Sequence, residues 1–178
     1  RVCDLISDEL KMKMECSEPA NSGKKIRLRV FEKPEYSMEV YSASKCAEIL
    51  KNSKTKILGM NMNFPKKGGG LAEKVVRSAI LTGKSGEKYG VIGVQPSDIH
   101  ERLKKQEVLE GITIDDKEQT KRELQEEVNT LENQGINKIF LLSHEGNRIE
   151  KDLAQSVSGI DVILGGHSHD LIENIEPE

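Results

Sequence analysis

The chain has 178 residues, of which 35% are hydrophobic and 32% charged, a balance that suits one soluble domain with a single core. Its 27 basic and 30 acidic residues give a formal net charge of -3, only 3% of its residues are aromatic, and it has no apolar run long enough to span a bilayer. These values argue against a nucleic-acid binder with a basic patch or stacked bases, and against a membrane span.

The start of the chain is predicted to hold a helix and a strand. Residues 2–16 fit a short amphipathic helix, and the turn-favouring residues 17–23 fit a loop. Apolar residues alternate over 26–30, which indicates a strand. Three widely spaced cysteines, at positions 3, 16 and 46, match neither a disulfide framework nor a zinc finger.

A second helix and strand are expected next. Residues 42–52 favour a helix with Ser44 at its N-cap, and residues 56–60 favour a buried strand. The glycine-rich run 66–70 is not followed by a Lys and a Ser or Thr at the start of a helix, as a phosphate-binding loop would be. We therefore interpret it as a flexible connection.

A β-hairpin and a long helix are predicted in the middle of the chain. The β-rich runs 75–81 and 88–94 are separated by the glycine-containing segment 82–87, which is typical of a hairpin. Residues 117–134 carry apolar side chains at helical spacings of four and three among many charges, and Gly135 is the expected end of this helix.

The C-terminal part predicts a parallel βαβ unit. Residues 138–142 and 162–164 are short apolar runs of the buried-strand type, and residues 149–157 between them favour a helix. A right-handed crossover makes the two strands parallel, so that both end at the same edge of the sheet. Ligand sites form at this edge in open α/β folds.

Three of the four histidines follow these two strands. His144 comes directly after the first, whereas His167 and His169 follow the second, behind Gly165 and Gly166. In an extended loop, His167 and His169 would point to the same side. We therefore expect the three imidazoles to converge on a divalent metal ion, for which neutral imidazole is a common ligand.

Other titratable residues are given different roles. His100 lacks such a setting and is assigned to a surface or local capping role. Glu145 and Asp170 are expected either to hydrogen-bond to the metal ligands without binding the metal themselves, or to face solvent. Asp161 is expected to begin a strand.

Several stretches together then match a known pattern: Leu142-Ser143-His144-Glu145-Gly146, Asp152-Leu153-Ala154, and Gly159-Ile160-Asp161-Val162-Ile163-Leu164-Gly165-Gly166-His167-Ser168-His169-Asp170. With them, the segment 139–170 closely resembles the C-terminal motifs of calcineurin-like metallophosphoesterases, specifically the 5′-nucleotidase branch. A weaker resemblance runs back through residues 89–94 to 57–61, and the whole covers about two thirds of the chain.

The resemblance implies an α/β fold, a layered β-sandwich flanked by helices, of which this chain is an incomplete part. It also implies two divalent metal ions that orient a bridging hydroxide for in-line attack on a phosphate ester. His144 and His167 match the histidines that bind the second metal, and His169 matches the ligand that closes the first. The resemblance does not distinguish Zn, Mn, Mg, Fe or Ca.

The family also uses an Asp-x-His, a Gly-Asp and an Asn-His-Glu motif, all of which we expect this chain to lack. Where the last should lie, shortly before Ser44, the residues are 36–41. Asn61 and Asn63 have no following His-Glu, so we interpret them as structural residues at a strand end. Three neutral imidazoles cannot hold two cations close together without carboxylates, so the chain alone is expected to be a poor enzyme.

We therefore expect one partial metallophosphoesterase domain over residues 1–178, with a divergent region at 1–43 and a family-like region at 44–178. The first hypothesis is that a parent protein hydrolyses nucleotides or related phosphate esters, with flanking segments completing the site. The alternative is a catalytically incomplete module that retains the fold and binds a metal or a partner. The resemblance suggests a periplasmic, cell-surface or extracellular location and leaves the substrate open.

Overall fold

The computed structural model describes residues 14–17 and 27–30 by their backbone, and residues 42–52, 56–65, 70–102 and 109–170. The chain divides into two compact units, residues 1–40 and 41–178. In the first unit, β1 (Met14–Ser17) pairs antiparallel with β2 (Arg27–Val30).

The strand predicted over residues 26–30 is confirmed by β2. The helix predicted over 2–16 is wrong at its C-terminal end, because residues 14–17 form β1, and residues 2–13 lie outside the described part. Helical periodicity is a weak signal in so short a segment, and pairing with a neighbouring strand overrides it.

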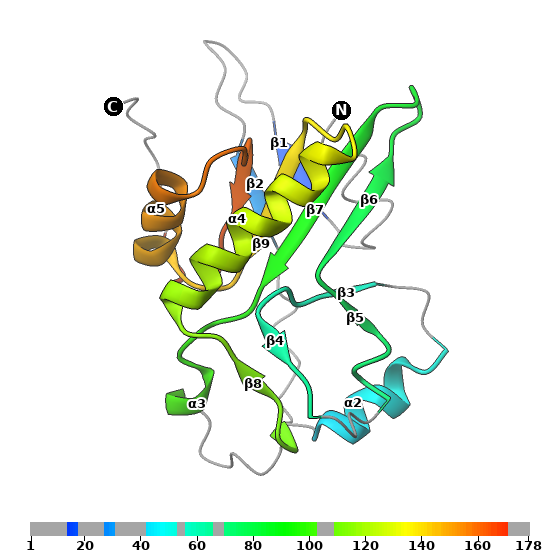
Figure 1. Ribbon diagram of the computed structural model, residues 1–178, viewed down its shortest axis with the longest axis vertical. Helices are drawn as coiled ribbons and strands as arrows, with labels where there is room; N and C mark the ends of the chain where they lie inside the picture. The colour runs from blue at the N-terminus through cyan, green and yellow to red at the C-terminus, as the bar shows by residue number, and fades with distance from the viewer. Residues whose placement is uncertain are drawn as a thin grey trace. The chain divides into compact units, whose positions relative to one another are not determined.

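A mixed four-stranded sheet forms the centre of the second unit, in the order β10-β9-β7-β6 (Figure 1). The predicted hairpin is confirmed by the antiparallel strands β6 (Ser78–Thr82) and β7 (Lys88–Val94). Strand β9 (Ile139–Ser143) pairs in parallel with both β7 and β10 (Val162–Leu164). The predicted α/β class and the parallel arrangement of the last two strands are therefore confirmed.

Two helices connect the parallel strands. α4 (Lys117–Asn133) precedes β9, and α5 (Asn147–Ser156) joins β9 to β10 and so completes the predicted βαβ unit. The Asp116 side chain caps α4 by accepting a hydrogen bond from the Gln119 N–H at 2.8 Å. Gly135, which follows α4, has φ 78°, the left-handed conformation expected after a helix end.

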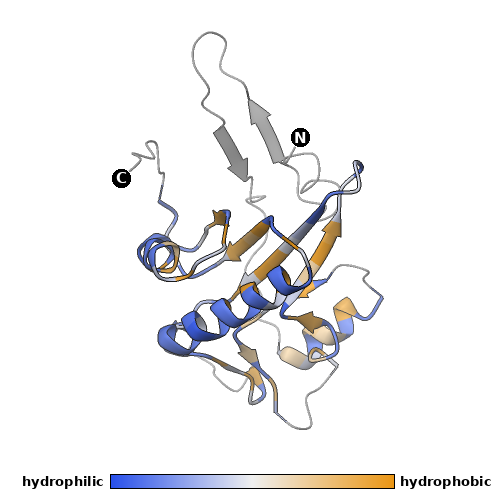
Figure 2. Ribbon diagram, turned by 45° about the horizontal axis from the view of Figure 1, so that its top comes forward, coloured by the Kyte–Doolittle hydropathy of each residue, from blue (hydrophilic) through white to orange (hydrophobic). Residues whose placement is uncertain are grey.

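The core lies between these helices and the sheet. Ile139 and Leu141, alternate residues of β9, cluster with Leu124, Val128 and Leu131 of α4, and all five are at most 1% exposed. The rest of α4 is strongly hydrophilic (Figure 2). The apolar face of β9, with every second residue buried, therefore packs against the apolar face of α4, with residues buried at spacings of four and three.

Shorter elements complete the second unit: α2 (Ala43–Leu50), α3 (Ile99–Arg102), the parallel pair β3 (Ile57–Leu58) and β5 (Val75–Val76), and the antiparallel pair β4 (Met62–Asn63) and β8 (Thr113–Ile114). Among the helices in the described part of the chain, none is long and apolar enough to cross a membrane.

The N-cap of α2 is Ser42, so the prediction of Ser44 is wrong. The Ser42 side chain accepts a hydrogen bond from the Lys45 N–H at 3.2 Å. Ser44 instead donates its hydroxyl and its backbone N–H to the carboxylate of Glu110, at 2.7 and 3.0 Å. Two serines fitted the local capping pattern, and a long-range contact decided between them.

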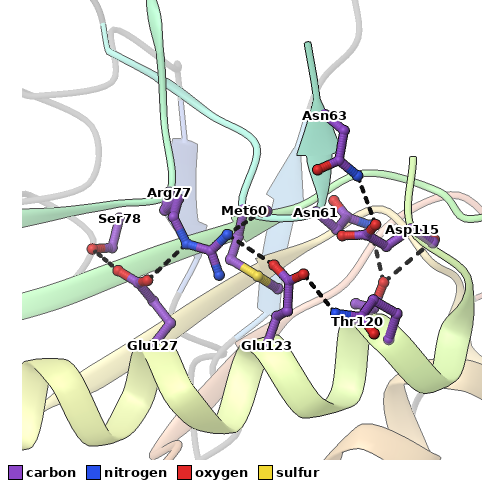
Figure 3. A network of polar contacts seen from close by, with 10 residues as sticks. Met60, Asn61, Asn63, Arg77, Ser78, Asp115, Thr120, Glu123 and Glu127 are labelled. Atoms are coloured by element: carbon purple, nitrogen blue, oxygen red, sulfur yellow. Dashed lines mark hydrogen bonds and ion pairs between the residues drawn. The ribbon is translucent and has the colours of Figure 1, made fainter. Parts of the chain in front are cut away.

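The strand predicted over 75–81 is broken at Arg77 into β5 and β6, which pair with different strands. The Arg77 guanidinium donates to Glu123 at 2.8 Å and to Glu127 at 3.0 Å, both on α4 (Figure 3). It also donates to the carbonyl oxygen of Met60 at 3.1 Å. The periodicity of the sequence could not show this break, because the partners of Arg77 on α4 lie more than 40 residues away in the chain.

Two asparagines fasten the region after β3. Asn61 is fully buried; its Nδ2 donates to the Gln95 carbonyl oxygen and its Oδ1 accepts from the Gln95 N–H, both at 2.8 Å. Asn63 donates to Asp115 at 2.6 Å. The structural role predicted for Asn61 and Asn63 is confirmed.

Substituting Gly93 with alanine should destabilise the second unit by roughly 1–3 kcal/mol, the usual effect of overpacking. A Cβ at this position of β7 would collide with the Leu58 side chain and lie 3.1 Å from the Leu58 backbone carbonyl atoms. Urea unfolding of Gly93→Ala and of Gly70→Ala measures the effect. Gly70 is the matched control because, among the described residues, a Cβ there meets only the Ala47 Cβ, at 3.6 Å. Equal stability of the two variants would contradict the packing described above.

Glu123→Gln should destabilise the protein more at neutral than at acid pH. The hydrogen bond from Gln119, together with that from Arg77, holds the pKa of Glu123 below its usual value although burial opposes them. A carboxyl with a lowered pKa stabilises the folded state above its ordinary pKa, and this contribution is lost as the pH falls through the lowered value. Urea unfolding of both proteins at about pH 7 and pH 3 tests the prediction, which fails if the difference is larger in acid.

Candidate functional site

Three loops follow β7, β9 and β10 at one edge of the sheet. The strands are parallel, so their C-terminal ends share this edge, where ligand sites form in open α/β folds. Residues 95–98 follow β7, residues 144–146 follow β9, and residues 165–170 follow β10. The His144 N–H donates to the carbonyl oxygen of Val94 at 3.2 Å and so joins the first two loops.

His144 and His167 are neighbours at this edge. Their ring centroids are 5.1 Å apart, and the ring planes are inclined by 70°. Two imidazole nitrogens on one Zn²⁺ can be up to about 4 Å apart, given Zn–N distances of roughly 2.0–2.1 Å. Rings this close can share one ion. The predicted convergence is thus observed for His144 and His167, while metal binding by them stays a prediction.

His169 differs from the other two histidines. It is exposed, and in the segment 109–170 it has no ring contact with either of them. The expectation of an extended loop is wrong, because His167 and His169 have φ values of 74° and 55°. Histidine is one of the residues enriched in this left-handed region, and such conformations cluster at functional sites.

Glu150 on the first turn of α5 holds two of the loops together. Its Oε1 accepts hydrogen bonds from the N–H groups of Gly146 at 3.2 Å and Gly166 at 3.3 Å. A side chain at Gly165 would collide with the same carboxylate. A carboxylate at a helix N-terminus is favourable in itself, and here it also fixes the backbone before His167.

Glu145 is buried, so the solvent-facing one of its two expected roles is wrong. It is 6% exposed, and its Oε2 accepts hydrogen bonds from the Ser97 N–H at 3.1 Å and the Ser97 hydroxyl at 2.9 Å. Burial raises the pKa of Glu145, and the two hydrogen bonds from Ser97 oppose that rise. Glu145 therefore ties the loop after β7 to the loop after β9.

Asp98 is a residue near the site that sequence reasoning missed. Its Oδ2 lies 3.9 Å from Nε2 of His167. Asp98, Ile99 and His100 spell Asp-x-His, so the expectation that this tripeptide is absent is wrong, although the family motif is expected upstream of this region. His100 itself lies half-buried in α3. The sequence signal that could have identified Asp98 is its place shortly after β7, a strand that runs parallel to β9.

Buried polar atoms without hydrogen-bond partners gather at this edge: Nε2 of His167, Oδ1 of Asp98 and Oε1 of Glu145. Such atoms are uncommon in folded proteins and indicate a missing partner such as a cation or water. In the described ranges, however, no three His, Cys, Asp or Glu side chains converge closely enough to hold a metal ion. The described side chains alone therefore do not make a complete metal site.

The comparisons with known proteins find nucleotide phosphoesterases and 5′-nucleotidases as relatives, and no family model matches the chain. The chain is 28% identical over 152 residues to the trifunctional nucleotide phosphoesterase protein YfkN of Bacillus subtilis, covering 82% of this chain and 9% of that protein. It is 38% identical over 96 residues to a probable 5′-nucleotidase of Treponema pallidum, covering 53% and 15%. The chain thus spans only a small part of these relatives.

Solved structures extend the similarity to the fold. The 5′-nucleotidase precursor of Thermus thermophilus matches with a TM-score of 0.65 and 28% identity, covering 75% of this chain and 25% of that one. The NAD nucleotidase of Haemophilus influenzae matches with a TM-score of 0.58 and 29% identity, covering 75% and 22%. The matched part of this chain is therefore similar to 5′-nucleotidases in both sequence and fold.

Proposed function

We propose that this chain supplies the histidine side of a divalent-cation site in a protein that hydrolyses phosphate esters of nucleotides or related compounds. The observation that carries the proposal is the contact between the His144 and His167 rings at the sheet edge. The names of the relatives, among them nucleotide phosphoesterases and 5′-nucleotidases, support the substrate class.

In this proposal, His144 and His167 bind one cation through imidazole nitrogens. A bound divalent cation would polarise a phosphoryl oxygen and lower the pKa of the attacking water. Glu150 keeps the two histidine loops at a fixed separation through Gly146 and Gly166. His169, which is exposed, is proposed as the ligand of a second cation, as the family resemblance implies.

A second cation needs carboxylates to offset the repulsion between the two charges. We assign them to segments of a longer parent protein, because this chain corresponds to 9 to 15% of the two curated relatives above. The word precursor in the name of the Thermus thermophilus neighbour supports a location outside the cytoplasm for that parent.

A second candidate function is a binding module without catalysis. It is favoured by the finding that no three potential ligands converge within the described residues. In this case His144 and His167 hold a single zinc ion, or the surface binds a partner protein, and no phosphate ester is cleaved.

Cation binding by this chain should depend on His144 and His167. Titration of the chain with Zn²⁺ or Mn²⁺ by isothermal calorimetry should give one site. His144→Ala and His167→Ala should each weaken the affinity by about 100-fold or more, because losing a residue that only hydrogen-bonds to a metal ligand already weakens it by about 10- to 100-fold. His100→Ala is the histidine control and should bind like the wild type. Unchanged affinity in both His144→Ala and His167→Ala would rule out the proposed ligands.

Phosphate-ester hydrolysis separates the two candidate functions. We expect a parent protein that contains this segment to release phosphate from AMP or to cleave a generic phosphodiester in the presence of Mn²⁺, and His167→Ala in the parent to abolish turnover. The 178-residue chain alone should show little activity. A parent that binds zinc at one site but has no turnover on either substrate would favour the binding module.

A further inference from the structure

The loop after β7 brings a carboxylate to the histidine pair. Asp98 Oδ2 is 3.9 Å from His167 Nε2, and neither Nε2 nor the other carboxylate oxygen, Oδ1, has a hydrogen-bond partner although both are buried. The His167 side chain is 17% exposed and that of Asp98 is 34% exposed. The two groups therefore lie close together in a partly buried place, where His167 Nε2 and Asp98 Oδ1 lack hydrogen-bond partners.

Neighbouring contacts hold Asp98 in this position. Its backbone follows Ser97, whose N–H and hydroxyl are both bound by the buried Glu145. Its Oδ2 accepts a hydrogen bond from Nε of Arg102 at 2.7 Å, one turn further along. Because Arg102 donates to Oδ2, Oδ1 can still accept a hydrogen bond, and the carboxylate can accept from two donors at once.

The separation of 3.9 Å is too long for a hydrogen bond and short enough that a small side-chain rotation closes it. Direct binding of a cation by Asp98 is less well supported, because no third ligand converges with it among the described residues. A hydrogen bond from Nε2–H to the carboxylate satisfies Nε2 without any further group, and satisfies Oδ1 as well when that oxygen accepts it. It also leaves Nδ1 of the same ring without a proton, so that its lone pair can bind a cation.

We propose that Asp98 is a positioning residue, which accepts a hydrogen bond from Nε2–H of His167 and so directs the Nδ1 lone pair of that ring toward the cation. Histidine ligands commonly donate their other ring N–H to a carboxylate, which fixes the tautomer and the ring orientation. The role in cation binding rests on the function proposed above, whereas the hydrogen bond can be tested in the metal-free protein.

Nuclear magnetic resonance of the ¹⁵N-labelled, metal-free full chain tests the hydrogen bond. At about pH 8, above the usual histidine pKa of roughly 6.5, His167 should carry its proton on Nε2 and give a protected Nε2–H signal. This signal should persist in Asp98→Asn, which keeps an acceptor oxygen, and in the control Glu101→Gln, and should be lost in Asp98→Ala. A wild-type His167 with its proton on Nδ1, or a protected signal that survives Asp98→Ala, would overturn the proposal.

Zn²⁺ affinity, measured by competition with a chromophoric chelator, tests the consequence. Asp98→Ala should bind Zn²⁺ about 10- to 100-fold more weakly than the wild type, and Asp98→Asn should recover part of this loss. Glu101→Gln, at an exposed position of the same helix, is the matched control for loss of a neighbouring charge and should bind normally. Equal affinity of Asp98→Ala and wild type contradicts the proposal. A wild type that binds no Zn²⁺ contradicts the proposed function instead, while the resonance test still decides on the Asp98 hydrogen bond.

Discussion

Parallel pairing of β7, β9 and β10 is the constraint on which the rest of the site depends. It brings the ends of three strands, separated by up to 70 residues in the sequence, to one edge of one sheet. His144, His167 and Asp98 all lie in loops that leave the sheet there. The buried layer of Leu124, Leu141 and their neighbours holds this pairing in place, because apolar surface removed from water is the main favourable contribution to folding.

The loops at this edge are held by polar contacts, in contrast to the apolar layer beneath them. Glu150 binds the backbone on both sides of the histidine pair, and Glu145 binds the loop that carries Asp98. Both are carboxylates acting on backbone N–H groups, a charge-assisted contact stronger than a neutral hydrogen bond. A site that must hold two imidazoles at a fixed separation benefits from such rigid support.

Much of this arrangement could be predicted from the sequence. The apolar runs 138–142 and 162–164 indicated the parallel strands, and the histidines behind them indicated the site. Local patterns could not predict contacts between distant segments. Three features each depend on a partner more than 40 residues away in the sequence. They are the break between strands at Arg77, the hydrogen bonds from Ser44 to Glu110, and the hydrogen bonds from Ser97 to the buried Glu145. The left-handed conformations of His167 and His169 were also missed, since histidine adopts them only where the fold imposes them.

The central claim is that His144 and His167 bind the same cation. X-ray absorption spectroscopy of the chain loaded with Zn²⁺ tests it most directly, because imidazole rings give a distinctive multiple-scattering pattern at a Zn–N distance of about 2.0–2.1 Å. The account predicts two imidazole ligands in the wild type and one in His144→Ala. Zinc surrounded by oxygen or sulfur alone, or a spectrum that His144→Ala leaves unchanged, would contradict it.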